Sequence, residues 1–246
     1  LINLQRRQHG AVGKMIIRII GPSKVVVFSR REHDYFRSIN LKPLMSRTGV
    51  DLTRFLPVSS EEKISIRKRY GFLPNDKLLL HAGHINHGRN IEILLSLIET
   101  DIKILVVGST STLVDHDLKE KLIMQGVRVI DSYLENIEEI YQMSDAYVFP
   151  VRNDHSAIEF PLSVLEAMAC NLPVVTTAYG SLSDYFKQTC CFAYFETDRD
   201  LKNQVSNILQ HACNNRQIVA ERFSWEVVFG DLFENLLNDD TLSDRH

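Results

Sequence analysis

Residues 156–177 read SAIEFPLSVLEAMACNLPVVTT, a pattern of loop, helix, turn and strand. A polar loop should lead into a helix over residues 161–170, because proline is favoured in the first helical turn, where its missing N–H costs nothing. Asn171 suits the left-handed position that ends a helix. Residues 172–177 then predict a short buried strand of a parallel sheet. A broad apolar stripe faces the core from Leu162, Val164, Leu165, Met168 and Ala169.

The chemistry of this stretch lies at the front of the predicted helix. The first N–H groups, near Leu162 and Ser163, form an anion site that the helix dipole strengthens. Glu166 stands in mid-helix among apolar neighbours. A solvated surface acid is the ordinary alternative, but a carboxylate in apolar surroundings needs hydrogen-bond donors, and ribose hydroxyls would supply them.

The rest of the chain alternates strand with helix, which predicts an α/β fold with a doubly wound parallel sheet, Rossmann-like in form. Ligands of such sheets bind beyond the carboxyl ends of the strands at the switch point, here the loops 84–89 and 151–159. Asn136 and Glu139 resemble a capping box. The expected strands are 24–29, 77–83, 102–108, 127–130, 146–150, 172–177 and 191–195, and the expected helices are 31–40, 91–99, 115–125, 137–143, 161–170 and 181–187, with closing helices over 198–237.

Composition narrows the class of protein. The chain has 246 residues, of which 44% are hydrophobic and 24% charged, enough for one or two globular domains with a core. The net charge of −3 gives no reason to expect nucleic acid. We expect the four cysteines to be reduced thiols in a cytoplasmic protein, since none forms a CxxC pair. No apolar run reaches the length of a membrane span. The chain has no initiator methionine, and we expect it to be a fragment.

The first 22 residues form a basic amphipathic stretch. We expect a helix that packs on a sheet with its basic residues in water. The alternative is peripheral contact with a membrane surface, at the inner face of the membrane, through Arg6, Arg7, Lys14 and Arg18.

The segment FPLSVLEAMACNLPVV, residues 160–175, resembles the signature of GT-B glycosyltransferases of family 4, typically E-G-F-G-x-x-x-L-E-A-M-A-x-G-x-P-V-V. Glu166 stands on the second acid of that signature. Strict register puts Ile158, not Glu159, on the first acid. Pro161 replaces the second glycine, and Asn171 replaces the glycine after the helix.

Three further segments are similar to the same family. Residues 43–57, PLMSRTGVDLTRFLP, resemble the crossover into its second domain. In GHINHGRN, residues 83–90, Gly83 matches, His84 stands on the family's arginine and Arg89 on its lysine. In residues 127–150, VRVIDSYLENIEEIYQMSDAYVFP, the backbone from Ile130 to Tyr133 would meet the base. Residues 222–237, with the single tryptophan, resemble the closing helix.

The resemblance implies a retaining glycosyltransferase, hexosyltransferase-like, which moves a sugar from a nucleoside diphosphate sugar to an acceptor hydroxyl of a glycan, a lipid-linked glycan or a small molecule. It implies a remnant of the acceptor domain over 1–45, a nucleotide-sugar-binding domain over 46–223, and a closing helix and tail over 224–246. No metal or cofactor is implied. Arg89 and Glu159 would be catalytic. The donor would be bound by Gly83, His84, Arg89, Ile130, Tyr133, Glu159, Phe160, Pro161, Leu162, Ser163 and Glu166.

Two other functions stay open beside this one: a non-catalytic nucleotide-sugar-binding module, and a GT-B sugar-nucleotide epimerase. A zinc site from His81, His84, His87 and a cysteine is a remote alternative, because His81 lies inside a predicted strand and no cysteine is close in sequence.

Overall fold

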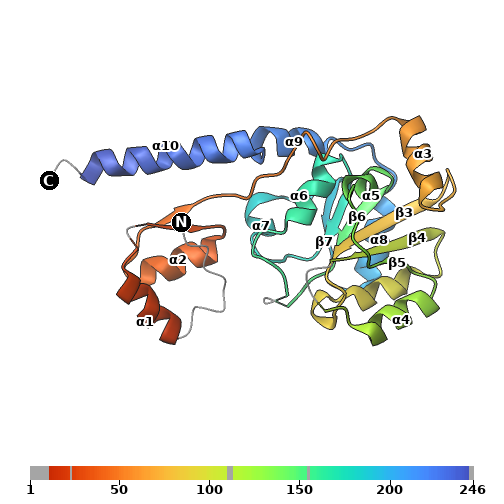
Figure 1. The fold of residues 1–246 in the computed structure, drawn as a ribbon, viewed down its shortest axis with the longest axis horizontal. Coiled ribbons are helices and arrows are strands. Elements are labelled where there is room, and N and C mark those ends of the chain that lie inside the picture. Colours follow the sequence, from red (N-terminus) through yellow and green to blue (C-terminus); the bar gives the residue numbers. More distant parts are fainter. Residues whose placement is uncertain (1–10, 23, 110–112, 154–155, 244–246) are drawn as a thin grey trace.

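The computed structural model describes residues 11–22, 24–109, 113–153 and 156–243. A small N-terminal part precedes a larger α/β body, and a long C-terminal helix runs back from that body along the N-terminal part (Figure 1). This helix, α10 (Trp225–Ser243), contacts the N-terminal part directly, because the Lys24 ammonium donates to the carbonyl of Leu236 at 3.2 Å.

The α/β body is built on one six-stranded sheet in which every neighbouring pair is parallel. The strand order is β5-β4-β3-β6-β7-β8, so the prediction of a doubly wound sheet is confirmed. The chain starts in the middle at β3 and winds outward first to one side and then to the other. The switch point therefore lies between β3 and β6, as expected. The strands are β3 (Lys77–Gly83), β4 (Ile102–Gly108), β5 (Arg128–Ile130), β6 (Ala146–Phe149), β7 (Val174–Thr176) and β8 (Phe192–Tyr194).

Helices cover both faces of the sheet, and the alternation along β3 shows why. Leu78 and Leu80 face one core, and Leu79 faces the other, since successive side chains of a strand point to opposite sides. The first core is closed by α3 (Ser60–Arg69), α5 (Glu138–Gln142), α6 (Leu162–Ala169) and α9 (Asn215–Arg222), and the second by η3 (Ile91–Leu97), α4 (His116–Met124) and α8 (Asp198–Ile208).

Helix α6 forms as its sequence predicts. Pro161 is its N-cap residue, and Cys170 closes it. Asn171 then adopts a φ of 62°, which confirms the left-handed position. The Asn171 side chain donates to the carbonyl of Cys213 at 2.8 Å, so this end of α6 is tied to the loop before α9.

The N-terminal part consists of α1 (Ala11–Ile20), β1 (Val25–Val27), α2 (Arg30–Ser38) and β2 (Pro43–Met45), with β1 and β2 paired in parallel. Ile17 of α1 is buried in one cluster with the strand residues Val25 and Val27, which confirms a helix that packs on a sheet. Of the basic residues considered for membrane contact, Lys14 and Arg18 lie on α1, and Arg6 and Arg7 lie outside the described residues. No helix in the described part of the chain is long and apolar enough to cross a membrane.

The junction between the two parts is tight at Gly49. A Cβ on this residue would lie 2.5 Å from the Trp225 ring, so only glycine permits this approach. The next residue, Val50, bridges to Ser224 immediately before α10 begins. The segment that leads into the α/β body and the segment that leads out of it into α10 therefore lie side by side at this point.

The helix predicted over 91–99 forms as a 3₁₀ helix over 91–97. Two local predictions are wrong. The capping box does not form, because the helix begins after Ile137 without a side-chain cap, and Glu139 pairs instead with Arg69 at 2.6 Å. The cysteines are not all reduced thiols: Cys191 and Cys213 form a disulfide, which leaves Cys170 and Cys190 free.

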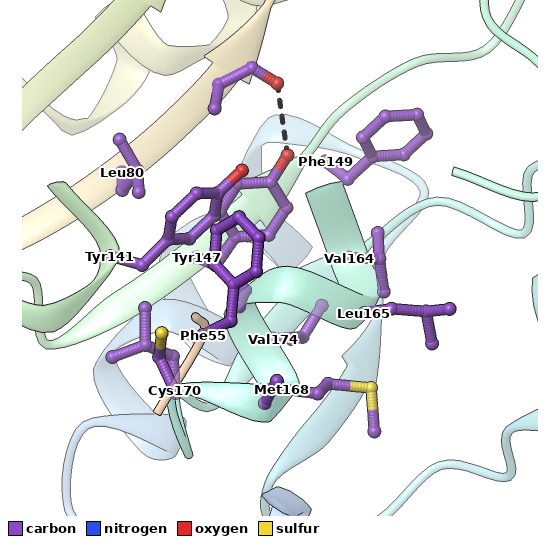
Figure 2. Close-up of a cluster of buried hydrophobic side chains, with 14 of the residues drawn as sticks. Phe55, Leu80, Tyr141, Tyr147, Phe149, Val164, Leu165, Met168, Cys170 and Val174 are labelled. Atoms are coloured by element: carbon purple, nitrogen blue, oxygen red, sulfur yellow. Dashed lines mark hydrogen bonds between the residues drawn. The ribbon is translucent and has the colours of Figure 1, made fainter. Parts of the chain in front are cut away.

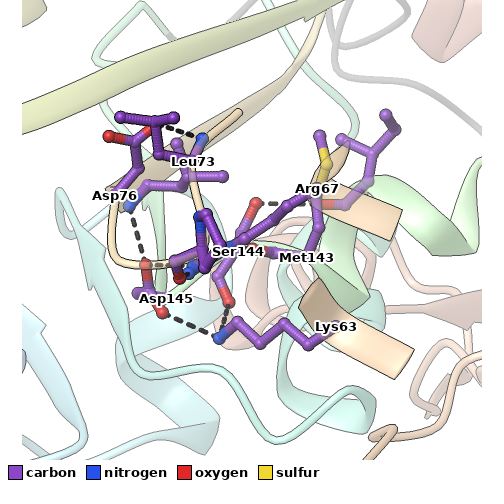
Figure 3. Close-up of polar contacts among 10 residues, drawn as sticks. Lys63, Arg67, Leu73, Asp76, Met143, Ser144 and Asp145 are labelled. Carbon is purple, nitrogen blue, oxygen red and sulfur yellow. Dashed lines mark hydrogen bonds and ion pairs between the residues drawn. The ribbon is translucent and has the colours of Figure 1, made fainter. Parts of the chain in front are cut away.

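Helix α3 is absent from the sequence prediction, and a cluster of polar contacts docks it against the sheet (Figure 3). Arg67 and Lys63 both reach the Asp145 carboxylate, at 2.6 and 2.7 Å, and Arg67 also donates to the carbonyl of Met143. The same carboxylate accepts from the backbone N–H of Leu78 at 2.7 Å. Asp145 thus links α3 to the starts of β3 and β6, at the end of the sheet opposite the switch-point loops.

Candidate functional site

A cleft of about 470 Å³ opens beyond the carboxyl ends of β3 and β4, between the loops that follow them and the start of α6. This is the place where open α/β sheets bind ligands. Most of the predicted donor-binding residues line it: Gly83, His84, Arg89, Tyr133, Pro161, Leu162, Ser163 and Glu166. Ser109, Ser132, Leu134, Ile137, Tyr141, Ala157 and Ile158 line it as well.

Arg89 is the cation of the cleft, and the loop after β3 fixes its backbone. Arg89 is the last residue of the 3₁₀ helix η2 (His87–Arg89). The side chain of Asn86, the N-cap residue of η2, accepts from the Arg89 N–H at 3.2 Å. Asn90 follows with a φ of 55° and donates to the carbonyl of Pro150 at 3.0 Å, which ties the loop to the end of β6. The side chain of Arg89 is 8% exposed.

Within the described part of the chain, no carboxylate balances the charge of this buried cation. No carboxylate of the described residues forms an ion pair with Arg89, and its Nε has no hydrogen-bond partner among them. Burial lowers the pKa of Arg89. A buried, unbalanced cation is costly unless an anion approaches it. The cleft is therefore suited to an anionic ligand.

The start of α6 faces the same cleft and offers hydrogen-bond donors. Pro161, at the N-cap, makes no side-chain capping bond, so the N–H groups of Leu162 and Ser163 are not taken by a cap. The positive end of the helix dipole adds to the attraction for an anion. Two independent features, the guanidinium and the helix start, thus favour negative charge in one place.

Glu166 reaches the cleft one turn further along α6, and the structure supplies it with a donor. The hydroxyl of Tyr141 donates to Glu166 Oε2 at 2.6 Å. Burial raises the pKa of Glu166, while this hydrogen bond and the positive charge of Arg54 offset part of the rise. The alternative of a solvated surface acid is wrong, because the carboxylate is half-buried in the wall of the cleft.

Tyr141 was not among the predicted site residues. Its ring is fully buried on α5 and packs edge-on against Phe55, with the centroids 5.6 Å apart. Figure 2 shows Tyr141 beside Tyr147, whose hydroxyl donates to the carbonyl of Ala82 at 3.2 Å. The aromatic cluster therefore fixes the hydroxyl that holds Glu166.

Two histidines flank Arg89 in different ways. His84 lines the cleft. Its pKa is lowered mainly by burial and, to a smaller extent, by the charge of Arg89. His81 lies fully buried behind Gly83, with its Nδ1 3.1 Å from the carbonyl of Val148. The described residues contain no group of three or more side chains of the His, Cys, Asp and Glu types that could hold a metal. The zinc alternative thus has no ligand set in this part of the chain.

Three of the predicted donor-binding residues do not line the cleft. Phe160 is buried in an aromatic cluster, with its ring centroid 5.1 Å from Tyr185 and 5.5 Å from Phe223. Ile130 packs at the end of β5 against the core. The carbonyl of Glu159 accepts from the N–H and the hydroxyl of Ser181, at 3.0 and 3.1 Å.

The wall of the cleft beside Glu159 is formed by Ile158. Strict register assigned the family's first acid to this position, and the register shift in the sequence therefore corresponds to a real change of side chain in the wall. Glu159 itself is held next to α7 (Leu182–Tyr185) through its backbone. Its position gives no support to a catalytic role for the Glu159 side chain.

Comparison with known proteins shows the family of the chain. The family model described as "Glycosyl transferases group 1" matches residues 62–222, more than half of the chain. An uncharacterized glycosyltransferase of Methanocaldococcus jannaschii is 26% identical over 188 residues, which cover 69% of this chain and 47% of that protein. Mannosylfructose-phosphate synthase of Agrobacterium fabrum is 28% identical over 54% of this chain and 32% of its own length. The chain thus spans about half or less of these relatives.

Solved structures share the fold. Sucrose-phosphate synthase from Thermosynechococcus elongatus superposes with a TM-score of 0.76 at 19% identity, over 97% of this chain and 65% of that chain. HepE of Anabaena, determined in complex with UDP-glucose, gives 0.74 at 15% identity, over 96% of this chain and 70% of that chain.

Proposed function

Because the chain belongs to the glycosyl transferases group 1 family, we propose that it supplies the donor-binding domain of a retaining, family 4 glycosyltransferase that moves a hexose from a nucleoside diphosphate sugar to an acceptor hydroxyl. One observation carries the proposal. Arg89 is 8% exposed, lacks a carboxylate partner among the described residues, and lies in the same cleft as the open start of α6. A diphosphate would balance both.

Each group in the cleft has a role in this reaction. The Arg89 guanidinium and the N–H groups of Leu162 and Ser163 hold the diphosphate and stabilise the charge that develops on it as the glycosidic bond breaks. Glu166 accepts hydrogen bonds from the ribose hydroxyls. Since these groups offset the diphosphate charge, the proposal needs no metal ion. HepE, which shares this fold, was determined in complex with UDP and with UDP-glucose, and this supports nucleotide-sugar binding by the chain.

The acceptor would be held by another domain. We assign residues 1–45 to the end of that domain, residues 46–223 to the donor-binding domain, and residues 224–246 to the closing helix and tail. Correct placement of two reactants is worth roughly 7–11 kcal/mol of the barrier in favourable cases. We therefore expect this chain to bind the donor without transferring the sugar at the rate of a complete enzyme.

A non-catalytic nucleotide-sugar-binding module and a sugar-nucleotide epimerase are the alternatives. All three functions need the same cleft for the nucleotide, so binding alone does not separate them. Release of a nucleoside diphosphate by the full-length protein, with a glycan or lipid-linked acceptor present, marks the transferase. Interconversion of two nucleotide sugars without such release marks the epimerase, and neither reaction marks the module.

Donor binding is tested by isothermal titration calorimetry of the chain with UDP-, GDP- and ADP-glucose. One of them should bind, and Arg89→Ala should weaken that binding strongly. Arg199→Ala is the matched control, because Arg199 is an exposed arginine on α8, away from the cleft. Absence of binding for all three nucleotide sugars and their free diphosphates would refute the proposal.

A cytoplasmic location belongs to the proposal too, but the disulfide removes one argument for it. Disulfides are rare in the cytosol of most cells. Mass spectrometry of the thiol-blocked protein, isolated without reductant, would show whether Cys191 and Cys213 are paired in the cell. A paired form as the main species would contradict a reducing compartment.

A further inference from the structure

His81 has a hydrogen-bonding capacity that the fold leaves partly unused. Its ring is 0% exposed on β3, and Nδ1 lies 3.1 Å from the carbonyl of Val148 on β6. A carbonyl oxygen can only accept, so Nδ1 carries the proton and Nε2 presents a lone pair. Nε2 has no partner among the described residues. Burial and the charge of Arg89 lower the pKa of His81 to about 4, which keeps the ring neutral near pH 7.

The unused acceptor lies near the guanidinium group of Arg89. A Cβ on Gly83 would lie 3.2 Å from His81 Nε2 and 3.4 Å from a terminal guanidinium nitrogen of Arg89, so both side chains contact the same spot behind Gly83. The Nε of Arg89 also has no partner among the described residues. Leaving a buried polar atom unpaired is costly, and here the two atoms are of opposite type.

We propose that His81 is a positioning residue for Arg89, whose neutral ring accepts a hydrogen bond from the guanidinium at Nε2, directly or through one water, and so holds it toward the diphosphate. This inference rests on the proposed function and deepens it. His81 does not line the cleft. It acts through Arg89.

A neutral acceptor suits this task better than a carboxylate. An aspartate or glutamate at this place would orient the guanidinium but would also cancel its charge, and the cleft would lose its attraction for an anion. A histidine whose other nitrogen is already bonded to a backbone carbonyl has a fixed ring plane and a fixed tautomer. It can therefore orient Arg89 and leave the full positive charge for the ligand.

Two amide variants distinguish the roles of the two ring nitrogens of His81. His81→Gln can place an amide oxygen near the position of Nε2, whereas His81→Asn reaches only the position of Nδ1. UDP, GDP and ADP are titrated into the wild-type chain, and the tightest of them is used with its parent nucleoside as the control probe. We expect His81→Asn to weaken the diphosphate about tenfold, His81→Gln to retain most of the affinity, and both variants to bind the nucleoside like the wild type.

A double-mutant cycle shows whether the effect passes through Arg89. In the Arg89→Ala background, His81→Asn should cause no further loss. An equal loss in both backgrounds, an unchanged diphosphate affinity of His81→Asn, or parallel weakening of diphosphate and nucleoside would each overturn the inference. A wild-type chain that binds none of the three diphosphates would remove the proposed function itself, which is a separate outcome.

A second measurement does not depend on the stability of the His81 variants. In the nitrogen-15 spectrum of the nucleotide complex, His81 should show a protonated Nδ1 and an Nε2 shifted from the value of a lone pair without a donor. Arg89→Ala should move the Nε2 signal back toward that value. A protonated Nε2, or a signal that does not respond to Arg89→Ala, contradicts the inference.

Discussion

Glu166→Gln should weaken donor binding and stabilise the fold at the same time. The substitution keeps the shape of the side chain, and its amide oxygen can still accept from the hydroxyl of Tyr141, which lies 2.6 Å from Glu166 Oε2 in the wild type. What disappears is the negative charge that would accept from the ribose. Hydrogen bonds to charged groups contribute about 1.5–3 kcal/mol, so we expect the dissociation constant to rise roughly 10- to 100-fold.

The effect on stability follows from burial. Burial raises the pKa of Glu166 above the 4.5 of an unperturbed side chain. A carboxyl group with a raised pKa in the folded state is tolerated best when protonated. Its penalty is therefore absent below pH 4.5 and fully present above the folded pKa. Glu166→Gln should unfold at a higher temperature than the wild type at pH 7, and the difference should vanish as the pH falls below 4.5.

Calorimetric titration with the tightest nucleoside diphosphate and thermal unfolding from pH 4 to pH 8 measure the two effects. Tyr141→Phe is the matched control for the hydrogen bond, because it removes the hydroxyl and keeps the ring and the Glu166 charge. Unchanged affinity of Glu166→Gln would mean that the carboxylate does not contact the donor. Lower stability of Glu166→Gln at pH 7 would refute the assignment of a desolvated carboxylate.

Three further experiments test the roles of the Arg89 charge, of a metal ion and of Asp145. Arg89→Lys should bind a nucleoside diphosphate more tightly than Arg89→Ala, because the positive charge contributes more than the bidentate geometry of the guanidinium; a Lys variant as weak as the Ala variant in calorimetry contradicts this. EDTA should leave donor binding intact, and an affinity that falls with EDTA and returns with magnesium would overturn the metal-free proposal. Asp145→Asn should lower the free energy of unfolding in urea by about 1.5–3 kcal/mol, since Arg67 and Lys63 lose their acid, with little change in donor affinity of the folded protein; an unchanged urea midpoint would show that these contacts add nothing.

The sequence predicts the sheet well because its signals are local. The strands 77–83 and 102–108 are apolar runs with β-branched or leucine-rich composition, and the structure forms them with the predicted bounds. The position of Arg89 and of the start of α6 follows from strand order alone, since both loops leave neighbouring strands at the same edge. Local pattern and topology together therefore predict most of the cleft.

The contacts that the sequence does not predict depend on packing between distant segments. Tyr141 and Glu166 are 25 residues apart, and their contact exists only because α5 packs on α6. Cys191 and Cys213 meet because the loop before α9 returns to the start of β8. Helix α3 is a different case, because its cap was readable: Ser59 accepts from the N–H of Glu62, acids open the helix and bases close it.

The residues that line the cleft differ in how firmly the fold holds them. Arg89 and Glu166 are fixed by buried neighbours, so their geometry is set before a ligand arrives, and such preorganisation favours tight binding of a diphosphate and ribose. In the same cleft, Ile158 and Leu162 are 48% and 37% exposed, and neither side chain can donate or accept a hydrogen bond. Sugars are distinguished by the orientation of their hydroxyls, which apolar groups read poorly. In the proposed reaction, selection of the sugar would therefore come from other groups, namely polar side chains of the cleft such as His84 and Ser109, its backbone groups, or the acceptor domain.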